Sequence, residues 1–329
     1  MKIFFLESSI SFNTNDLNSE NIGGTEKVLI NIVNELAKNK LLKIKVFNKT
    51  SSKIILNNVE WNNLSNYDSN DVPDVIIAFS DINLFKNYKA KKKFLWSHSI
   101  QNIEKFIRKR QLFAYLKHRP ILILEGEYHY NNRPLLNSFF GKNILKLAPD
   151  YEFINETVDI KTLPEKNCIF TTKSDRNLNI LLDSWTKINE INKDAKLFIN
   201  PPYNLNPEQI AKNIFLRKKG NKKALINDLK NSKIMLNPGH KGEVFCLAAE
   251  EARELCLPIV TLGYGSLYER VIHNKTGYIA KNLDEFVMYA NKLLNNNDLY
   301  FEFRKNLSLL RNSRNYANVA KELLDMIKN

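Results

Sequence analysis

The sequence predicts an α/β protein built from two doubly wound domains that face a cleft. Short apolar segments of strand length alternate with segments of helical periodicity along the chain. The alternation stops after Pro149-Asp150 in a polar stretch, and a second strand–helix series opens at Cys168. We therefore expect a first domain at residues 1–150, a connection at 151–166 and a second domain at 167–312. A last helix at 313–329 could cross back to the first domain.

The composition limits the class of protein. The chain has 329 residues, of which 43% are hydrophobic, enough for two cores. It lacks an apolar run long enough to span a bilayer, and its first residues, MKIFFLESS, turn polar too soon for a signal peptide. The three cysteines show no metal-ligand spacing, and their odd number suits a reducing compartment. These features predict a cytoplasmic protein without a metal site.

The net charge of +14 points to anionic partners. Anionic lipid, phosphate or nucleic acid would attract such a chain, but a general bias toward Lys and Asn explains the charge equally well. The basic residues concentrate at 103–119, which we predict to be one helix with interleaved aromatic residues, and at 89–93 just before it. Two interpretations stay open: a membrane-surface patch that serves a lipid-linked acceptor, and a solvated helix face.

Two candidate binding features of the first domain lie at the start of a helix and at the end of a strand. Gly23 and Gly24 place bare backbone amides at the start of a helix that follows the first strand, which favours an anion or close ligand approach, although such a pair is often only a turn. His98 follows the apolar strand at 93–97, and ligands of open α/β sheets gather at the carboxyl ends of strands. There it could contact a sugar, a phosphate or an acceptor, or simply cap the edge of the core.

The most informative stretch of the second domain is 243–269. Plotted as a helix, residues 247–256 place Glu250, Arg253 and Glu254 on a polar arc that we expect to be solvated. Glu251 instead lies within the apolar arc. A carboxylate there needs a hydrogen-bonding partner, which a polar ligand at the start of the helix would supply. The alternative is an ordinary amphipathic helix with one misplaced glutamate.

This stretch resembles the donor-binding signature of the retaining glycosyltransferases of family 4, which have the GT-B fold. The pattern is a Glu, a Phe two residues later, and a second Glu followed by Ala after seven intervening residues. Here these positions are Glu243, Phe245, Glu251 and Ala252. The sequence departs from the pattern at Cys246 and Cys256, where the family often has glycine.

The resemblance implies roles for particular residues. Glu243 would lie beside the donor sugar, and Glu251 would accept hydrogen bonds from both ribose hydroxyls. The family's Arg and Lys that bind the donor diphosphate match this sequence only in part: Arg176 falls near the Lys position, and Lys173 could compensate for the threonine at the Arg position. The implied donor-binding set is Gly23, Gly24, Lys173, Arg176, Val244, Phe245, Cys246, Leu247 and Glu251.

The resemblance also implies an activity. It is a metal-independent, retaining transfer of a sugar from a nucleotide-sugar donor to a glycan, lipid-linked or other hydroxyl acceptor, in polysaccharide biosynthesis at the inner face of the membrane. No cofactor is implied, because the nucleotide sugar is a substrate. His98 and Glu243 would be positioning and electrostatic groups of the catalytic centre, and the acceptor would lie near His98 and the Gly23-Gly24 turn. Two alternatives remain: a nucleic-acid-binding protein that uses the basic surface, the less favoured one, and a GT-B domain that binds a donor without transferring it.

Overall fold

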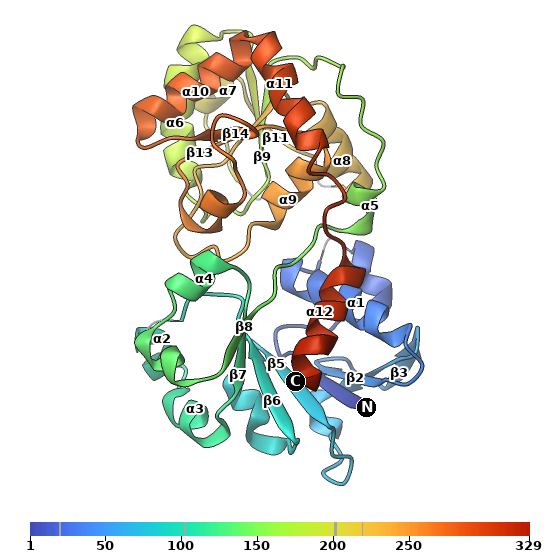
Figure 1. Ribbon diagram of the computed structural model, residues 1–329. Coiled ribbons are helices and arrows are strands. Elements are labelled where there is room, and N and C mark those ends of the chain that lie inside the picture. Colours follow the sequence, from blue (N-terminus) through green and yellow to red (C-terminus); the bar gives the residue numbers. More distant parts are fainter. Residues whose placement is uncertain (20, 102, 201–202, 219) are drawn as a thin grey trace. The chain divides into compact units, whose positions relative to one another are not determined.

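The computed structural model describes residues 1–19, 21–101, 103–200, 203–218 and 220–329, which form two compact units (Figure 1). Unit 1 comprises residues 1–148 and 316–329, and unit 2 comprises residues 149–315. The C-terminal helix α12 (Tyr316–Lys328) thus belongs to unit 1, where it packs on α1 (Gly24–Ala37).

Unit 1 is built on an eight-stranded sheet of order β3-β4-β2-β1-β5-β6-β7-β8, parallel except between β3 and β4. Its central strands are buried on both faces, as the apolar run of 75–79 predicts for a parallel strand. The strands are β1 (Lys2–Leu6), β2 (Lys43–Asn48), β3 (Ile54–Leu56), β4 (Val59–Asn63), β5 (Val75–Phe79), β6 (Lys92–Trp96), β7 (Ile121–Leu124) and β8 (Lys142–Ile144). The short helices are η1 (Thr14–Asn18), η2 (Leu64–Asn66), η3 (Ile82–Asn87), α2 (Ile103–Arg108), α3 (Leu112–His118), α4 (Glu127–Asn131) and η4 (Leu135–Phe139).

The prediction of one basic helix at 103–119 is wrong. Arg110 adopts a left-handed conformation with φ of 50°, and this separates α2 from α3. The next residue, Gln111, is fully buried and donates from its side chain to Asp81 Oδ1 at 2.9 Å. A continuous helix would remove this anchor. The hairpin between β3 and β4 was also not predicted; Asn57 and Asn58 form its turn, both with positive φ, as two-residue hairpin turns require.

Unit 2 is built on a six-stranded parallel sheet of order β11-β10-β9-β12-β13-β14. One face carries α6 (Leu178–Ile191) and α10 (Leu283–Asn295), and the other carries α8 (Lys222–Lys230) and α9 (Leu247–Glu254). The strands are β9 (Asn167–Phe170), β10 (Lys196–Ile199), β11 (Ile214–Leu216), β12 (Ile234–Leu236), β13 (Ile259–Thr261) and β14 (Gly277–Ile279). The remaining helices are α5 (Tyr151–Ile154), α7 (Pro207–Ala211), η5 (Gly265–Glu269) and α11 (Asn297–Ser308).

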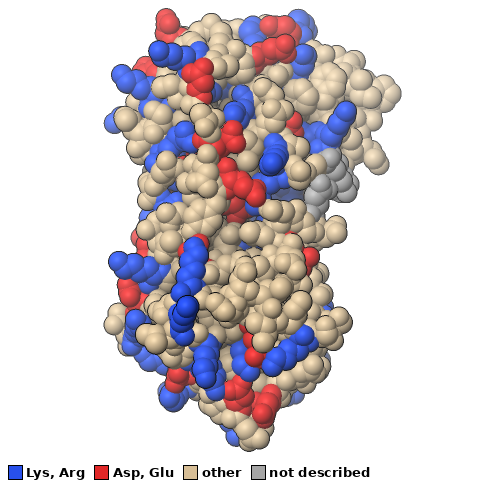
Figure 2. All heavy atoms as spheres, turned by 90° about the vertical axis from the view of Figure 1, so that its right-hand side faces the viewer, with Lys and Arg blue, Asp and Glu red and all other residues tan. Residues whose placement is uncertain are grey.

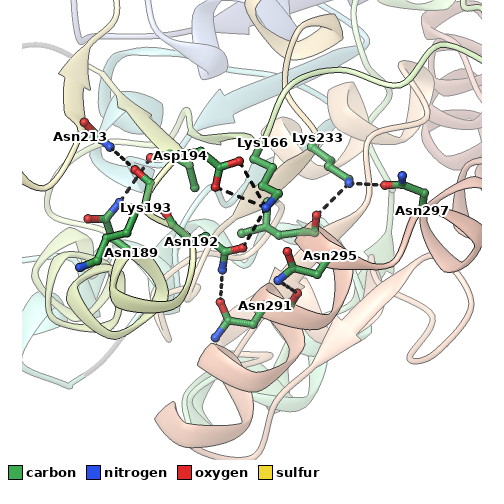
Figure 3. Close-up of polar contacts among 12 residues, drawn as sticks. Lys166, Asn189, Asn192, Lys193, Asp194, Asn213, Lys233, Asn291, Asn295 and Asn297 are labelled. Atoms are coloured by element: carbon green, nitrogen blue, oxygen red, sulfur yellow. Dashed lines mark hydrogen bonds and ion pairs between the residues drawn. The ribbon is translucent and has the colours of Figure 1, made fainter.

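A network of lysine and asparagine side chains closes the amino edge of this sheet (Figure 3). Lys233, buried just before β12, donates to Leu294 O at 2.9 Å and to Asn297 Oδ1 at 2.7 Å. Asn192 donates to Asn291 Oδ1 at 2.6 Å. A cavity of about 570 Å³ opens here. Because open α/β sheets bind their ligands at the opposite, carboxyl edge, we interpret this network as joining α10 and α11 to the sheet.

Candidate functional site

Three loops meet at the carboxyl edge of the unit 2 sheet, after β9, β12 and β13. The side chain of Asn177, in the first loop, donates to Gly239 O in the second at 2.6 Å. Gly239 in turn forms an isolated bridge with Tyr264 in the third loop. Ser266 N donates to Glu243 O at 3.0 Å. The three loops therefore form one connected scaffold around residues 239–243.

Gly265 is a position at which this scaffold tolerates no side chain. Its φ is 69°, a conformation that L-residues other than glycine rarely adopt. A Cβ atom there would lie 2.3 Å from His240 O and 2.8 Å from Glu243 O. The loop that carries Glu243 therefore rests directly on the backbone of the loop after β13.

Arg176, His240 and Glu243 come together on the scaffold. His240 Nδ1 lies 3.0 Å from Arg176 Nη1 and accepts from Gly242 N at 3.0 Å. With Nδ1 as the acceptor, the proton of neutral His240 resides on Nε2. Burial raises the pKa of Glu243, while the nearby Arg176 opposes the rise. Glu243 Oε2 has no hydrogen-bond partner among the described residues. This half-buried carboxyl can therefore accept a bond from a ligand hydroxyl beside a fixed cation.

The residues that lead into α9 turn their side chains inward. Val244, Phe245 and Cys246 are buried, and Cys246 Sγ lies 3.8 Å from the Asn237 side-chain amide. A ligand at this edge would meet their backbone, at the positive end of a helix. Leu247 and Glu251 are half-buried. Lys173 is exposed, in the same loop as Arg176.

The prediction that Glu250, Arg253 and Glu254 form a solvated face is wrong. Glu250 and Glu254 are 5% and 0% exposed. Glu250 pairs with Arg253 and, at 3.2 Å, with Arg270, which also stacks on the Phe245 ring. Glu254 pairs with Arg253 at 2.9 Å and accepts from Asn312 N at 2.9 Å. A helical wheel cannot show that later parts of the chain, beyond η5 and α11, cover this face.

The helix is also shorter than the predicted 247–256. It ends at Glu254, and Cys256 adopts a left-handed conformation with φ of 54°. This is the position at which the resembled family often has glycine, the residue best suited to that conformation. Cys256 therefore occupies a backbone conformation that would suit glycine.

In unit 1, His98 lies at the carboxyl edge of the sheet after β6. Its Nδ1 pairs with Glu125 Oε1 at 2.5 Å, and its ring stacks on that of Phe79 with centroids 4.9 Å apart. His98 Nε2 is buried and has no hydrogen-bond partner within the described parts of the chain. Behind this pair, His129 Nδ1 accepts from Glu125 N at 3.2 Å. Burial lowers the pKa of His129 to about 4, so it is neutral at pH 7.

Glu125 and His129 were missed in the sequence. Glu125 directly follows the apolar strand 121–124, the same signal that drew attention to His98. No such signal marks His129 in the sequence. It lies on α4, and its importance follows only from its hydrogen bond with Glu125. Buried Glu125, supported by His129, fixes the His98 ring so that Nε2 is available to a partner.

Gly23 and Gly24 are exposed at the start of α1, with Gly23 as the N-cap. A Cβ atom on Gly23 would lie 2.8 Å from Glu26 Oε2. Ser9 Oγ donates to Glu26 Oε1 at 2.7 Å, and Ser9 N donates to Glu7 Oε1 at 2.8 Å. Burial and the nearby Glu26 raise the pKa of Glu7. The carboxylates make this turn better suited to a hydroxyl donor than to the anion that the glycines alone suggest.

Comparisons with known proteins agree with this fold. Residues 172–308, which lie within unit 2, match the family model described as glycosyl transferases group 1. A search of curated proteins gave no match. Among the residues that the structure describes, none of the helices is both long and apolar enough to cross a bilayer.

Solved structures of the GT-B fold resemble the whole chain. WaaG, a glycosyltransferase involved in lipopolysaccharide biosynthesis, shares 11% identity over 99% of both chains, with a TM-score of 0.70. Anabaena HepE in complex with UDP and glucose shares 13% identity over 100% of this chain and 99% of that chain, with a TM-score of 0.72. An S. aureus TarM mutant in complex with fondaparinux, alpha-GlcNAc-glycerol and UDP shares 18% identity over 84% of this chain, with a TM-score of 0.63. The chain spans 62% and 55% of the lengths of the two TarM chains it matches. The chain therefore has the GT-B fold.

Proposed function

We propose that this protein is a retaining, metal-independent glycosyltransferase that moves a sugar from a nucleotide-sugar donor to a hydroxyl of a glycan or lipid-linked acceptor. One observation carries the proposal: Arg176, His240 and Glu243 converge beside the start of α9 within the group 1 domain. The UDP present in structures of HepE and TarM, which share the fold, supports a nucleotide-sugar donor.

On this proposal, unit 2 binds the donor. Arg176, with exposed Lys173 nearby, lies beside the diphosphate and stabilises the charge that grows as the bond to the sugar breaks. Glu243 accepts a bond from a sugar hydroxyl. Glu251, one turn into α9, accepts bonds from the ribose hydroxyls, and charge-assisted bonds of this kind contribute roughly 1.5–3 kcal/mol each. The backbone amides at the start of α9 add favourable potential for the phosphates.

Unit 1 binds the acceptor, with His98 as a positioning and electrostatic group. Glu125 holds its imidazole so that Nε2 can bond to the acceptor hydroxyl. In the transfer, the bond between the anomeric carbon and the diphosphate oxygen breaks and a bond to the acceptor oxygen forms on the same face. The acceptor proton passes to the departing diphosphate, so no protein nucleophile is required.

A thermal-shift screen of the full chain with UDP-, GDP- and ADP-sugars tests the donor class, since a ligand that binds only the folded state raises the melting temperature. We expect one nucleotide to stabilise the chain and to support transfer that resists EDTA and retains the anomeric configuration by NMR. Stabilisation without transfer or hydrolysis would indicate a binding domain that has lost activity. No stabilisation by any of them would contradict the proposal.

Glu243→Gln separates the role of this residue from folding. We expect transfer to fall about a hundredfold. Because burial raises the pKa of Glu243, the ionised form destabilises the folded state at neutral pH, and stability is lost as pH rises above the ordinary carboxyl range. The variant should therefore melt no lower than the parent at pH 8. The exposed Glu302→Gln on α11 is the matched control and should change neither quantity.

A further inference from the structure

An apolar surface surrounded by basic residues lies on the edge of unit 1 formed by α2, α3 and η4. Phe113 and Phe139 are 82% and 80% exposed, and Ile107 is 69% exposed. Leu116 and Leu135 are exposed as well. We call these five residues the apolar surface. Isolated exposed apolar residues are common, but five large ones on three short neighbouring elements are not.

A buried ring cluster holds the three elements together. Tyr115 on α3 packs against Phe106 on α2, with centroids 5.1 Å apart, and against Phe140 after η4, with centroids 5.5 Å apart. The immediate neighbours Ile107 and Phe139 are exposed although Phe106 and Phe140 are buried. α2 and α3 lie next to each other at one edge of unit 1 (Figure 1). The apolar surface is therefore the outer side of one compact layer.

The charge of this layer is strongly positive. Residues 104–119 contain six basic residues and one acidic residue, Glu104. Residues 133–148 add Arg133, Lys142 and Lys146 without an acidic residue. On the face that Figure 2 shows, by contrast, Lys and Arg lie scattered among Asp and Glu. The layer that carries the apolar surface thus has a clear basic excess.

We propose that this layer docks unit 1 on an anionic lipid bilayer. Short amphipathic elements lie in the interface, with apolar side chains among the acyl chains and basic side chains at the anionic headgroups. The charge selects this occupant over a second copy of the chain, because a symmetric dimer would place two positive surfaces against each other. The aliphatic members of the surface favour acyl chains over a polynucleotide, which stacks its bases on aromatic rings.

This inference uses none of the donor-site residues and stands apart from the proposed function. If both hold, the protein meets a lipid-linked acceptor at the surface where it docks, and the bilayer raises the local concentration of that acceptor.

The test is co-sedimentation of the full chain with vesicles of phosphatidylcholine alone or with 30% phosphatidylglycerol, at 0.15 and 0.5 M salt. We expect binding to the anionic vesicles that weakens at high salt. Phe113→Ser with Phe139→Ser should lower the partition coefficient about tenfold. Lys109→Glu with Lys117→Glu should lower it about twentyfold or more.

Matched controls come from exposed residues of unit 2. Ile191→Ser with Leu309→Ser removes two exposed apolar side chains, and Lys193→Glu with Lys305→Glu reverses two charges; both variants should bind as the parent does. Melting curves and the thermal shift with nucleotide sugars should be unchanged in all variants, which separates docking from folding and from donor binding.

Three results would overturn the proposal. One is the lack of binding to anionic vesicles. Another is an equal loss of binding in the control variants. The third is a dimer without vesicles that dissociates in the Phe113→Ser and Phe139→Ser variant, because a second copy would then cover the surface.

Discussion

Each of the two units has its candidate site residues at the carboxyl edge of its own sheet, but the two units hold these residues by different means. In unit 2, the loops meet largely through backbone: Ser266 N donates to Glu243 O, and Gly265 lies against the carbonyl oxygens of His240 and Glu243. In unit 1, the site depends on buried side chains that pair directly, His98 with Glu125, supported by His129.

Because of this difference, the two sites should respond differently to substitution. A scaffold of backbone contacts fails when an added atom forces loops apart, so binding and folding are lost together. A pair of buried side chains can lose its electrostatic role while the backbone stays in place. Side chains added at the glycines of the unit 2 loops should therefore lower stability, and substitutions in the unit 1 pair should affect turnover.

The largest effect is expected from Gly265→Ala. The new Cβ would meet two carbonyl oxygens and the backbone would be strained, so we expect unit 2 to lose about 3 kcal/mol or more of unfolding free energy, together with donor binding. Chemical denaturation and calorimetry measure both.

Gly141→Ala is the control, because its Cβ would meet only the Ile121 side chain at 3.6 Å. It should change stability by less than about 0.5 kcal/mol. Equal stability of the two variants would show that the loops of unit 2 are not packed as described.

Glu125→Gln should act on turnover alone. Without the carboxylate, the His98 ring is less well oriented, so kcat/KM for the acceptor should fall about tenfold to a hundredfold.

Exposed Glu127→Gln, two residues away, should leave kcat/KM unchanged. Donor affinity should be unchanged in both variants. A loss of donor binding in Glu125→Gln would mean that the two units do not divide the substrates as proposed.

A smaller effect should appear in acid. His129 has a pKa of about 4 in the folded state, below the ordinary 6.5, because burial disfavours its charged form. The stability linked to neutral His129 is present above pH 6.5 and is lost as pH falls toward 4, by on the order of 2 kcal/mol. Urea unfolding of the parent and of His129→Gln across this range should show a weaker pH dependence in the variant. His273→Gln, at an exposed histidine, should leave that dependence as it is.

The sequence predicted most of the fold because the strands of both sheets are apolar runs with clear ends. The prediction was wrong at positions whose structure depends on contacts with residues far away in the chain. The break between α2 and α3 depends on Gln111 reaching Asp81, and the burial of Glu250 depends on Arg270, twenty residues later.

For the same reason, the candidate site of unit 2 was predicted more completely than that of unit 1. In unit 2 the loop that carries Glu243 is local in sequence and has a recognisable pattern, so the residues that the structure brings together near Glu243 were largely named in advance. The link between Arg176 and His240 was not predicted, because it spans 64 residues. In unit 1, Glu125 lies far from His98 in the chain, and only the strand order shows that they are neighbours.

The central claim is that a nucleotide sugar binds at the carboxyl edge of the unit 2 sheet, with its ribose on Glu251. Isothermal titration of the parent and Glu251→Ala with the nucleotide sugar that gives the largest thermal shift tests it most directly. We predict an affinity at least about tenfold weaker for Glu251→Ala, because charge-assisted bonds to the ribose are lost, and an unchanged affinity for the control Glu302→Ala. An affinity for Glu251→Ala equal to that of the parent would contradict the account.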